Sequence, residues 1–218
     1  MVELGGYPLI FHVIEAAKRS KNIDRLICST DDERISSFVL GQGVEVHDRP
    51  KYLAQDMTPV LDVFTHLLND FGEQEGRIAD ILVILQPTSP FLRSEDVHQA
   101  VSILRDEELA DSVQTITGFP HNYHAYNQRL IQEGWVSFCF PEERGKYYNK
   151  NTKPKHYMFG NLIVTRSRTI LEKKDIFGER SRFIEIPFHY ALDVDGPDDL
   201  DLAKYYLQTR KVNLPWIG

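Results

Sequence analysis

The 218-residue sequence has no long apolar stretch and no recognisable leader segment. A membrane-spanning helix needs about 18 or more consecutive apolar residues. The longest apolar run here, residues 81–85, has only the length of a strand. The first six residues contain no charged lead followed by an apolar core, so we expect no secretory signal. These absences predict a protein without a membrane partner.

Cysteine and positive charge are also scarce. Cys28 and Cys139 lie in apolar segments and form no C-x-x-C pair. This is typical of reduced core residues and predicts a cytoplasmic protein. The 25 Lys and Arg residues are outnumbered by 32 Asp and Glu residues, which gives a net charge of −7. Because nucleic-acid binding relies on clustered positive charge, we expect no nucleic-acid partner.

Several catalytic signatures are missing. The sequence contains neither a G-x-S-x-G nucleophile motif nor a Walker lysine motif. Among the eight histidines, His121 and His124 are the pair that lies close in sequence, and without a cysteine or carboxylate pattern they do not predict a zinc site. The composition, 42% hydrophobic and 26% charged, is that of a globular protein. We expect residues 1–218 to form a single domain.

What is present is an alternation of short apolar runs with helical patterns. The runs predict strands at residues 24–30, 44–46, 81–85, 111–117, 159–165, 183–187 and 191–195. Helical periodicity occupies residues 8–21, 31–40, 60–71, 94–105 and 197–207. This order predicts an α/β fold, with a Rossmann-like, mostly parallel sheet and helices on both faces. Ligands bind beyond the carboxyl ends of such strands, which here are polar at residues 29–32, 49–50 and 86–89.

The alternation stops between residues 118 and 160, where aromatic side chains are interspersed with polar and basic ones. Two interpretations are open. The stretch is either a loop-and-hairpin insertion with a small core of its own, or a lid or subunit interface, since large surface aromatic clusters usually contact a partner. In both cases we expect residues 118–160 to form an inserted arm.

The strongest local signal for chemistry is the run Asp193-Val194-Asp195-Gly196. In an extended backbone alternate side chains share one side, so both carboxylates face together while Val194 turns into the core. Two such oxygen ligands suit Mg²⁺, which retains waters and bridges to phosphates. Turns and helix caps also contain Asp-x-Asp. The apolar run before it and the helix after it favour a phosphoryl-transfer site.

Residues 86–90 (QPTSP) form a second polar segment. The two prolines stiffen the backbone, while Gln86, Thr88 and Ser89 offer neutral hydrogen-bonding groups suited to a sugar or a base. A plain turn has the same composition. Arg93, just beyond, adds a cation that an anionic ligand could use.

Taken together, these residues resemble the acylneuraminate cytidylyltransferase family, enzymes that make CMP-sialic acids and related CMP-activated nonulosonates. Six segments match in family order and span nearly the whole chain. They are residues 6–10 (GYPLI), 29–35 (STDDERI), 49–50 (RP) with 53–56 (LAQD), 86–93 (QPTSPFLR), 110–113 (ADSV) and 192–200 (LDVDGPDDL).

The resemblance implies a nucleotide-diphospho-sugar-transferase type of fold and Mg²⁺ as cofactor. It also implies transfer of CMP from CTP to an acidic nine-carbon sugar, with release of pyrophosphate, in a homodimer joined through residues 118–160. Asp193 and Asp195 would be the catalytic, Mg²⁺-holding residues, with Asp195 helping to deprotonate the attacking hydroxyl. The remaining roles it implies are nucleotide binding by Arg49 and Thr58 and sugar binding by Gln86, Ser89 and Lys150.

The sequence departs from the family pattern in two places. The family's glycine- and lysine-containing loop, which wraps the triphosphate, has no counterpart, and the given sequence starts just after its position; we therefore expect little turnover from this chain alone. The family's R-Q-x-x-P-x-x-Y-x-x-N-G stretch reads KNTKPKHYMFGN at residues 150–161. Lys150 replaces the sugar-facing arginine, which keeps the charge but loses the planar fork that holds a carboxylate.

Two alternative functions remain open. A GT-A glycosyltransferase also carries an Asp-x-Asp metal motif, although that motif normally lies in the middle of the domain rather than after nearly all strands. A non-catalytic nucleotide-sugar-binding or scaffold subunit would use the sheet face and the aromatic arm, and the lack of a phosphate loop favours it.

Overall fold

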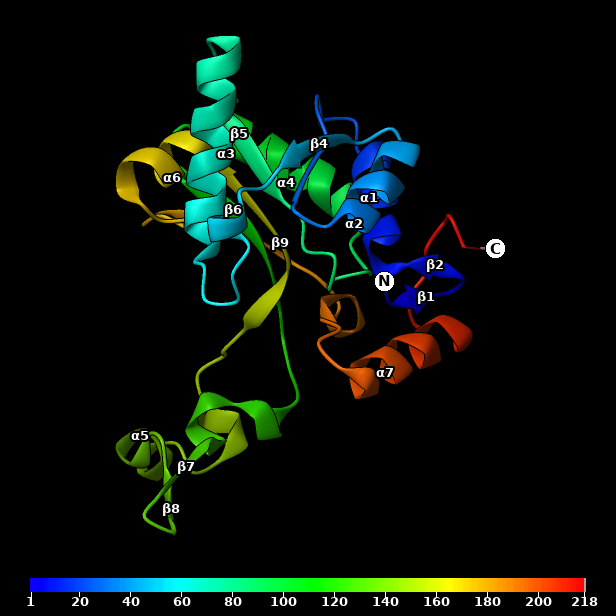
Figure 1. The fold of residues 1–218 in the computed structure, drawn as a ribbon. Coiled ribbons are helices and arrows are strands. Elements are labelled where there is room, and N and C mark those ends of the chain that lie inside the picture. Colours follow the sequence, from blue (N-terminus) through cyan, green and yellow to red (C-terminus); the bar gives the residue numbers. More distant parts are fainter. Residues whose placement is uncertain (218) are drawn as a thin grey trace.

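A computed structural model describes residues 1–217 (Figure 1). The helices are α1 (Leu9–Arg19), α2 (Glu33–Gly41), α3 (Val60–Glu75), α4 (Ser94–Asp106), α5 (Pro141–Lys146), α6 (Ser167–Lys173) and α7 (Pro197–Gln208). The strands are β1 (Glu3–Leu4), β2 (Tyr7–Pro8), β3 (Ile27–Thr30), β4 (Glu45–Asp48), β5 (Ile81–Ile84), β6 (Ser112–Thr117), β7 (Arg129–Gln132), β8 (Trp135–Phe138), β9 (Met158–Arg166) and β10 (Ser181–Glu185). Short 3-10 helices are η1 (Lys51–Leu53), η2 (His121–Tyr123), η3 (Ala125–Asn127), η4 (Lys150–Thr152) and η5 (Phe188–Ala191).

The central sheet has the strand order β10-β6-β9-β5. Strands β10 and β6 are parallel, whereas β9 runs antiparallel to both β6 and β5. Strands β3 and β4 form a separate parallel pair. The expected α/β fold is confirmed, but its sheet is mixed rather than mostly parallel. The reason is that the chain leaves β6, passes through the arm and returns beside β6 as β9, which reverses its direction.

The main core lies between this sheet, α1 and α4. Val97, Ala100, Val101 and Leu104 of α4 recur at helical spacing, and all four are buried. Phe91 and the adjacent Leu92, just before this helix, are also fully buried. Packing of α4 therefore anchors the C-terminal end of the polar segment that follows β5.

A bulge interrupts the pairing of β6 with β9 between Gln114 and Ile116. The side-chain hydroxyl of Thr115 takes over the pairing there, accepting hydrogen bonds from the backbone N–H groups of Asn161 (2.8 Å) and Leu162 (2.9 Å). The Asn161 side chain in turn donates to the carbonyl of Tyr190 at 2.8 Å. This network ties β9 to η5, which leads into the Asp193 segment.

Residues 118–157 leave the sheet and form the arm that projects away from it in Figure 1. Its hairpin pairs β7 with β8 around Glu133 and Gly134. Both have positive φ, 51° and 82°, as a tight two-residue hairpin turn requires. All four residues of β7 are exposed.

One predicted strand is wrong. Residues 191–195 do not join a sheet; the stretch begins in η5 and continues without a partner strand among residues 1–217. Its backbone instead pairs with a loop, because the N–H of Val194 donates to the carbonyl of Thr88 at 2.7 Å. Among the described residues, no helix has the length and apolar character needed to cross a membrane.

Candidate active site

The polar segment after β5 forms a tight turn. The carbonyl of Gln86 accepts a hydrogen bond from the N–H of Ser89 at 3.0 Å, with Pro87 in the position that favours its fixed φ. Gln86 is exposed, whereas Ser89 is only 2% exposed. The turn therefore presents Gln86 outward while Ser89 lies beneath it.

The two aspartates are attached to this turn. Besides the Val194–Thr88 backbone bond, the hydroxyl of Ser89 donates to Oδ1 of Asp193 at 3.4 Å. Val194 is 7% exposed and packs in the core, whereas Asp193 and Asp195 are exposed on either side of it. The alternation expected from the sequence is present even though the segment is not a strand. Two carboxylates thus stand on the surface beside a rigid polar turn.

The start of α7 fixes the backbone behind Asp195. Oδ2 of Asp199 accepts hydrogen bonds from the N–H groups of Asp195 (3.1 Å) and Gly196 (3.0 Å), and Pro197 begins the helix. Within residues 1–217 no hydrogen bond or ion pair occupies the Asp195 carboxylate, which leaves it available to a ligand. Sequence reasoning missed the role of Asp199, although an acid three residues after a helix cap is its usual signal.

Arg49 lies at the carboxyl ends of β3 and β4. Its N–H donates to the carbonyl of Thr30 at 3.0 Å, its Nε donates to the Ser29 hydroxyl at 3.3 Å, and its Nη2 donates to the Ser29 carbonyl. Burial raises the pKa of the neighbouring Cys28 thiol, against the opposing effect of the Arg49 charge. Cys28 is therefore protonated at neutral pH and unsuited to act as a nucleophile.

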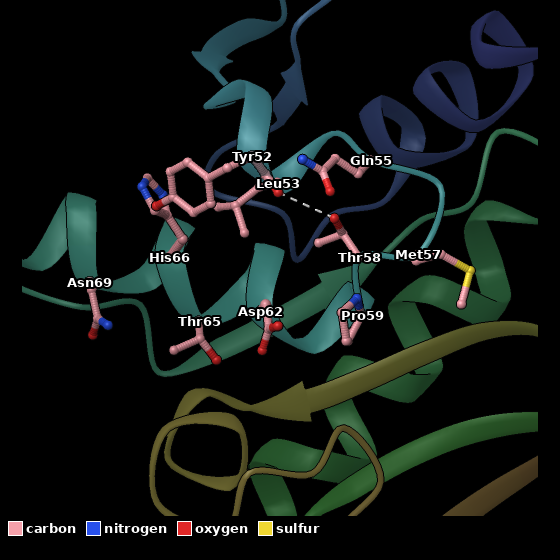
Figure 2. A pocket seen from close by; sticks show the side chains of 10 residues that line it. All are labelled: Tyr52, Leu53, Gln55, Met57, Thr58, Pro59, Asp62, Thr65, His66 and Asn69. Atoms are coloured by element: carbon pink, nitrogen blue, oxygen red, sulfur yellow. Dashed lines mark hydrogen bonds between the residues drawn. The ribbon is translucent and has the colours of Figure 1, made fainter.

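Thr58 lines an open cavity of about 530 Å³ beside α3 (Figure 2). Its hydroxyl donates to the carbonyl of Tyr52 at 3.4 Å. The cavity is bounded by the loop before α3 and by that helix, and its lining residues are Tyr52, Leu53, Gln55, Met57, Thr58, Pro59, Asp62, Thr65, His66 and Asn69. The two aspartates and Gln86 are not among them.

The structure thus brings the predicted site residues together in two groups. In the first group, Ser89 contacts Asp193, and Gln86 and Asp195 lie on the same two hydrogen-bonded segments. In the second group, Arg49 and Thr58 lie at the two ends of the loop after β4. Lys150 belongs to neither group. It lies in η4 of the arm, which extends away from the sheet in Figure 1.

Arg93 is not free to bind an anion, contrary to the expectation from sequence. Its guanidinium donates to both carboxylate oxygens of Asp96, at 2.6 and 2.7 Å, and lies over the ring of Tyr190 with its centre 4.8 Å from the ring centroid. The Asp96 carboxylate is almost completely buried, whereas the Arg93 side chain is partly exposed. Arg93 stabilises the start of α4 rather than a ligand.

The sequence profile of the cytidylyltransferase family matches residues 1–214, almost the entire chain. The chain belongs to the cytidylyltransferase family. It is 27% identical to the N-acylneuraminate cytidylyltransferase of Streptococcus agalactiae over 201 residues, which cover 91% of this chain and 47% of that protein. It is 28% identical to the CMP-N,N'-diacetyllegionaminic acid synthase of Legionella pneumophila over 211 residues, 94% of this chain and 87% of that protein. It thus spans about half the length of the first relative and most of the second.

Solved structures show the same fold. The structure of CMP:2-keto-3-deoxy-manno-octonic acid synthetase complexed with CTP superposes with a TM-score of 0.69 at 18% identity, covering 96% of this chain and 91% of that one. The 4-diphosphocytidyl-2C-methyl-D-erythritol synthase of Anaerococcus prevotii superposes with a TM-score of 0.62 at 15% identity, covering 94% and 88%. The predicted nucleotide-diphospho-sugar-transferase type of fold is therefore confirmed.

Proposed function

We propose that this chain transfers CMP from CTP to the anomeric hydroxyl of an acidic nine-carbon sugar, an N-acylneuraminate or a related nonulosonate, and releases pyrophosphate. One observation carries the proposal. Asp193 and Asp195 are exposed, and the segment that carries them is hydrogen-bonded to the neutral polar turn that contains Gln86 and Ser89. Relatives named for CMP transfer to N-acylneuraminate and legionaminic acid support this assignment over a glycosyltransferase.

The donor set fits a magnesium ion. Asp193 and Asp195 are both exposed and offer carboxylate oxygens two residues apart in the chain, and Mg²⁺ is commonly held by one or two carboxylates together with substrate phosphates. When bound, the ion would neutralise charge on the phosphates of CTP. The hydroxyl of Ser89 holds Asp193 in orientation, so Ser89 supports this set from beneath.

In the proposed reaction, the sugar hydroxyl oxygen forms a bond to the α-phosphorus of CTP while the bond to the β-phosphate oxygen breaks. The Asp195 carboxylate accepts the hydroxyl proton, and pyrophosphate leaves with the electron pair of the broken bond. Gln86 faces the sugar, and Arg49 and Thr58 face the nucleotide. The exposed amide of Gln86 supports the first placement, and the cavity that Thr58 lines supports that of Thr58.

We further propose that two copies pair through the arm, residues 118–157. Its hairpin exposes large apolar side chains, with Ile131 76% and Trp135 79% exposed. Such side chains are enriched where proteins contact one another. Pairing would also allow Lys150 to reach the sugar site of the other copy, since within one chain the arm points away. The free cysteines Cys28 and Cys139 fit a reducing, cytoplasmic location.

Pyrophosphate release from CTP tests the proposed activity directly. Because we expect only slow turnover from the 218-residue chain alone, it is incubated at high concentration with CTP, Mg²⁺ and either N-acetylneuraminate, a legionaminate or a neutral hexose. We expect release only with the acidic sugars, and a loss of roughly a hundredfold or more in Asp195→Asn, which removes the proposed general base. Asp201→Asn, an exposed acid on α7, serves as the control. Binding of CTP without turnover in any sugar would favour the scaffold alternative, and equal activity of Asp195→Asn would refute the assigned base.

A further inference from the structure

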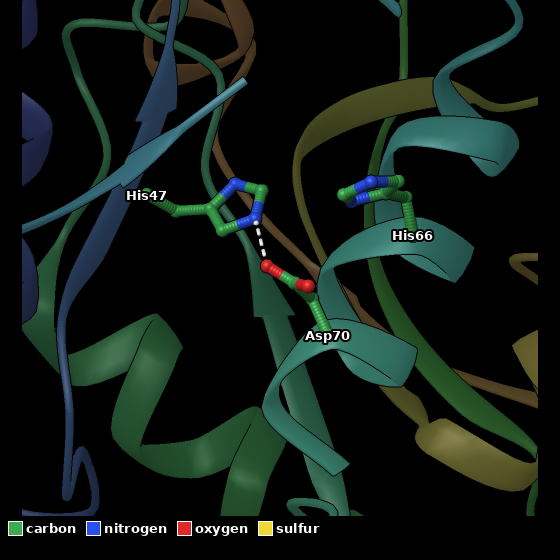
Figure 3. A group of neighbouring side chains, drawn as sticks. All are labelled: His47, His66 and Asp70. Carbon is green, nitrogen blue, oxygen red and sulfur yellow. Dashed lines mark hydrogen bonds and ion pairs between the residues drawn. The ribbon is translucent and has the colours of Figure 1, made fainter. Parts of the chain in front are cut away.

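A second cluster of ligand-type side chains lies between β4 and α3 (Figure 3). His47 extends from β4, while His66 and Asp70 extend from successive turns of α3, and the three side chains converge. One ligand atom from each lies within 4.8 Å of the other two. The four-residue spacing of His66 and Asp70 places both on the same face of the helix. Strand and helix thus present three potential metal ligands to one point.

His47 is held in a defined orientation. Its Nδ1 lies 3.0 Å from the hydroxyl of Ser29, and its Nε2 lies 3.1 Å from Oδ2 of Asp70. The residue is only 8% exposed. Histidines that bind metals usually make a hydrogen bond with the nitrogen that does not ligate, which fixes the ring. Ser29 provides this contact, so Nε2 is directed into the cluster.

His66 supplies an independent observation. Its Nδ1 is buried, and no hydrogen-bonding partner for it exists within residues 1–217. Buried polar atoms in folded proteins nearly always have a partner. The His66 ring also lies close to that of His47, with centroids 5.5 Å apart and planes inclined at 62°. The cluster therefore contains an imidazole whose hydrogen-bonding capacity the protein leaves unused.

A simpler interpretation is an ion pair between His47 and Asp70, with His66 packed against it. This accounts for the 3.1 Å contact. It does not account for the unsatisfied nitrogen of His66 or for the convergence of all three side chains. A bound cation accounts for all of these features.

We propose that His47, His66 and Asp70 bind a divalent transition-metal ion, and that Zn²⁺ is the preferred ion. Two imidazoles and one carboxylate form a common three-ligand set, which leaves a fourth position for water. Mg²⁺ favours oxygen ligands, so this site is chemically distinct from the Asp193 and Asp195 pair. Ligand atoms around a tetrahedral Zn²⁺ lie roughly 3.4 Å apart, so the three ligand atoms, which lie within 4.8 Å of one another, would have to draw together on binding.

The site has a structural consequence for the region of Arg49 and Thr58, which we assign to nucleotide binding. The ion would join β4 to α3, and these elements flank the loop at residues 49–59. Ser29 links His47 to Arg49, because its hydroxyl contacts both side chains. His66 also lines the cavity that contains Thr58. Metal binding would therefore stiffen the region that we assign to the nucleotide, independently of the catalytic aspartates.

The test is metal binding by the full chain after dialysis against a chelator. We expect one Zn²⁺ per chain by calorimetry and a rise in Tm of roughly 5 °C at a hundredfold excess over the dissociation constant. His66→Gln and Asp70→Asn should lose the Zn²⁺-induced rise. His98→Ala, an exposed histidine on α4, and His156→Ala, from the histidine cluster of the arm, should keep it.

Cobalt gives a reading that does not depend on stability. Co²⁺ bound to the wild-type protein should show visible absorption bands, and His66→Cys should add a thiolate-to-cobalt charge-transfer band. Four results would each overturn the proposal. They are absence of metal binding in the wild type, an unchanged Zn²⁺-induced rise in Tm in His66→Gln, loss of that rise in His156→Ala, and a missing charge-transfer band in His66→Cys. None of these readings involves CTP turnover, so they stand apart from the proposed enzymatic function.

Discussion

Ser89 and Asp193 lie 104 residues apart in the sequence, yet the Ser89 hydroxyl donates a 3.4 Å hydrogen bond to Oδ1 of Asp193. Ser89 is buried and Asp193 is exposed, so the serine supports the carboxylate from the protein side. The contact connects the turn after β5 with the segment before α7. It makes the geometry of the proposed metal ligand dependent on a residue that does not itself reach the surface.

Ser89→Ala should therefore impair catalysis without unfolding the protein. Removing a group that orients a metal ligand typically costs about 10–100-fold in activity or metal affinity. We expect pyrophosphate release to fall by roughly tenfold and the Mg²⁺ concentration for half-maximal rate to rise. Ser37→Ala, at an exposed serine of α2, should leave both values unchanged. A normal Mg²⁺ dependence in Ser89→Ala would argue against the orienting role.

The bulge at Thr115 offers a test of fold stability. Thr115→Val removes the acceptor for two buried N–H groups, those of Asn161 and Leu162. Each unsatisfied buried group costs about 1–3 kcal/mol, so we expect a loss of at least about 2 kcal/mol in urea unfolding. Thr117→Val is the matched control, because that buried hydroxyl only donates to the carbonyl of Gly118. Equal losses in both variants would contradict the proposed pairing.

Asp111 should make stability depend on pH. Burial would raise the pKa of this carboxyl. Hydrogen bonds from Lys173 and from the backbone of Arg180 and Glu179 outweigh that effect and lower it. Because the carboxyl has a lower pKa in the folded than in the unfolded state, its ionisation stabilises the fold. This stabilisation is complete above the unfolded pKa of about 3.9 and is lost as the pH falls through the folded pKa.

Asp111→Asn should accordingly lower the free energy of unfolding by about 1–3 kcal/mol at pH 7. The difference from the wild type should shrink below about pH 4, as measured by urea unfolding at both pH values. Asp106→Asn changes an exposed acid at the end of α4 and should show neither effect. A wild-type advantage that persists at low pH would show that charge on Asp111 is not its source.

The arm should control the oligomeric state. Ile131→Ser combined with Trp135→Ser removes two exposed apolar side chains from the β7–β8 hairpin and leaves the central sheet unchanged. We expect a dimer for the wild type and a monomer for the double variant in sedimentation equilibrium. Leu109→Ser, at a residue that is 72% exposed but outside the arm, should remain dimeric. A monomeric wild type would refute the proposed interface.

Local patterns in the sequence determined most of the elements. Val97, Ala100, Val101 and Leu104 repeat at the helical period, and this repeat alone is enough to place α4 and its buried face. The alternation around Val194 likewise predicted which side chains face outward. In both cases the signal lies within one turn or one short extended segment, where neighbouring residues share the same backbone geometry.

Tertiary structure alone decided which segments meet. The reversal of β9, the attachment of Val194 to Thr88, and the convergence of His47 with His66 and Asp70 all join residues whose spacing in the chain follows no local period. Such contacts form because buried polar groups must find partners once the apolar faces have packed, and that outcome depends on the whole chain. The amino-acid sequence by itself therefore determined five of the seven helices, most strands of the described residues 1–217 and the chemical types of the candidate site, whereas α5 and α6 were not expected from it. The packed fold decided the mixed sheet, the Ser89–Asp193 contact and the histidine cluster.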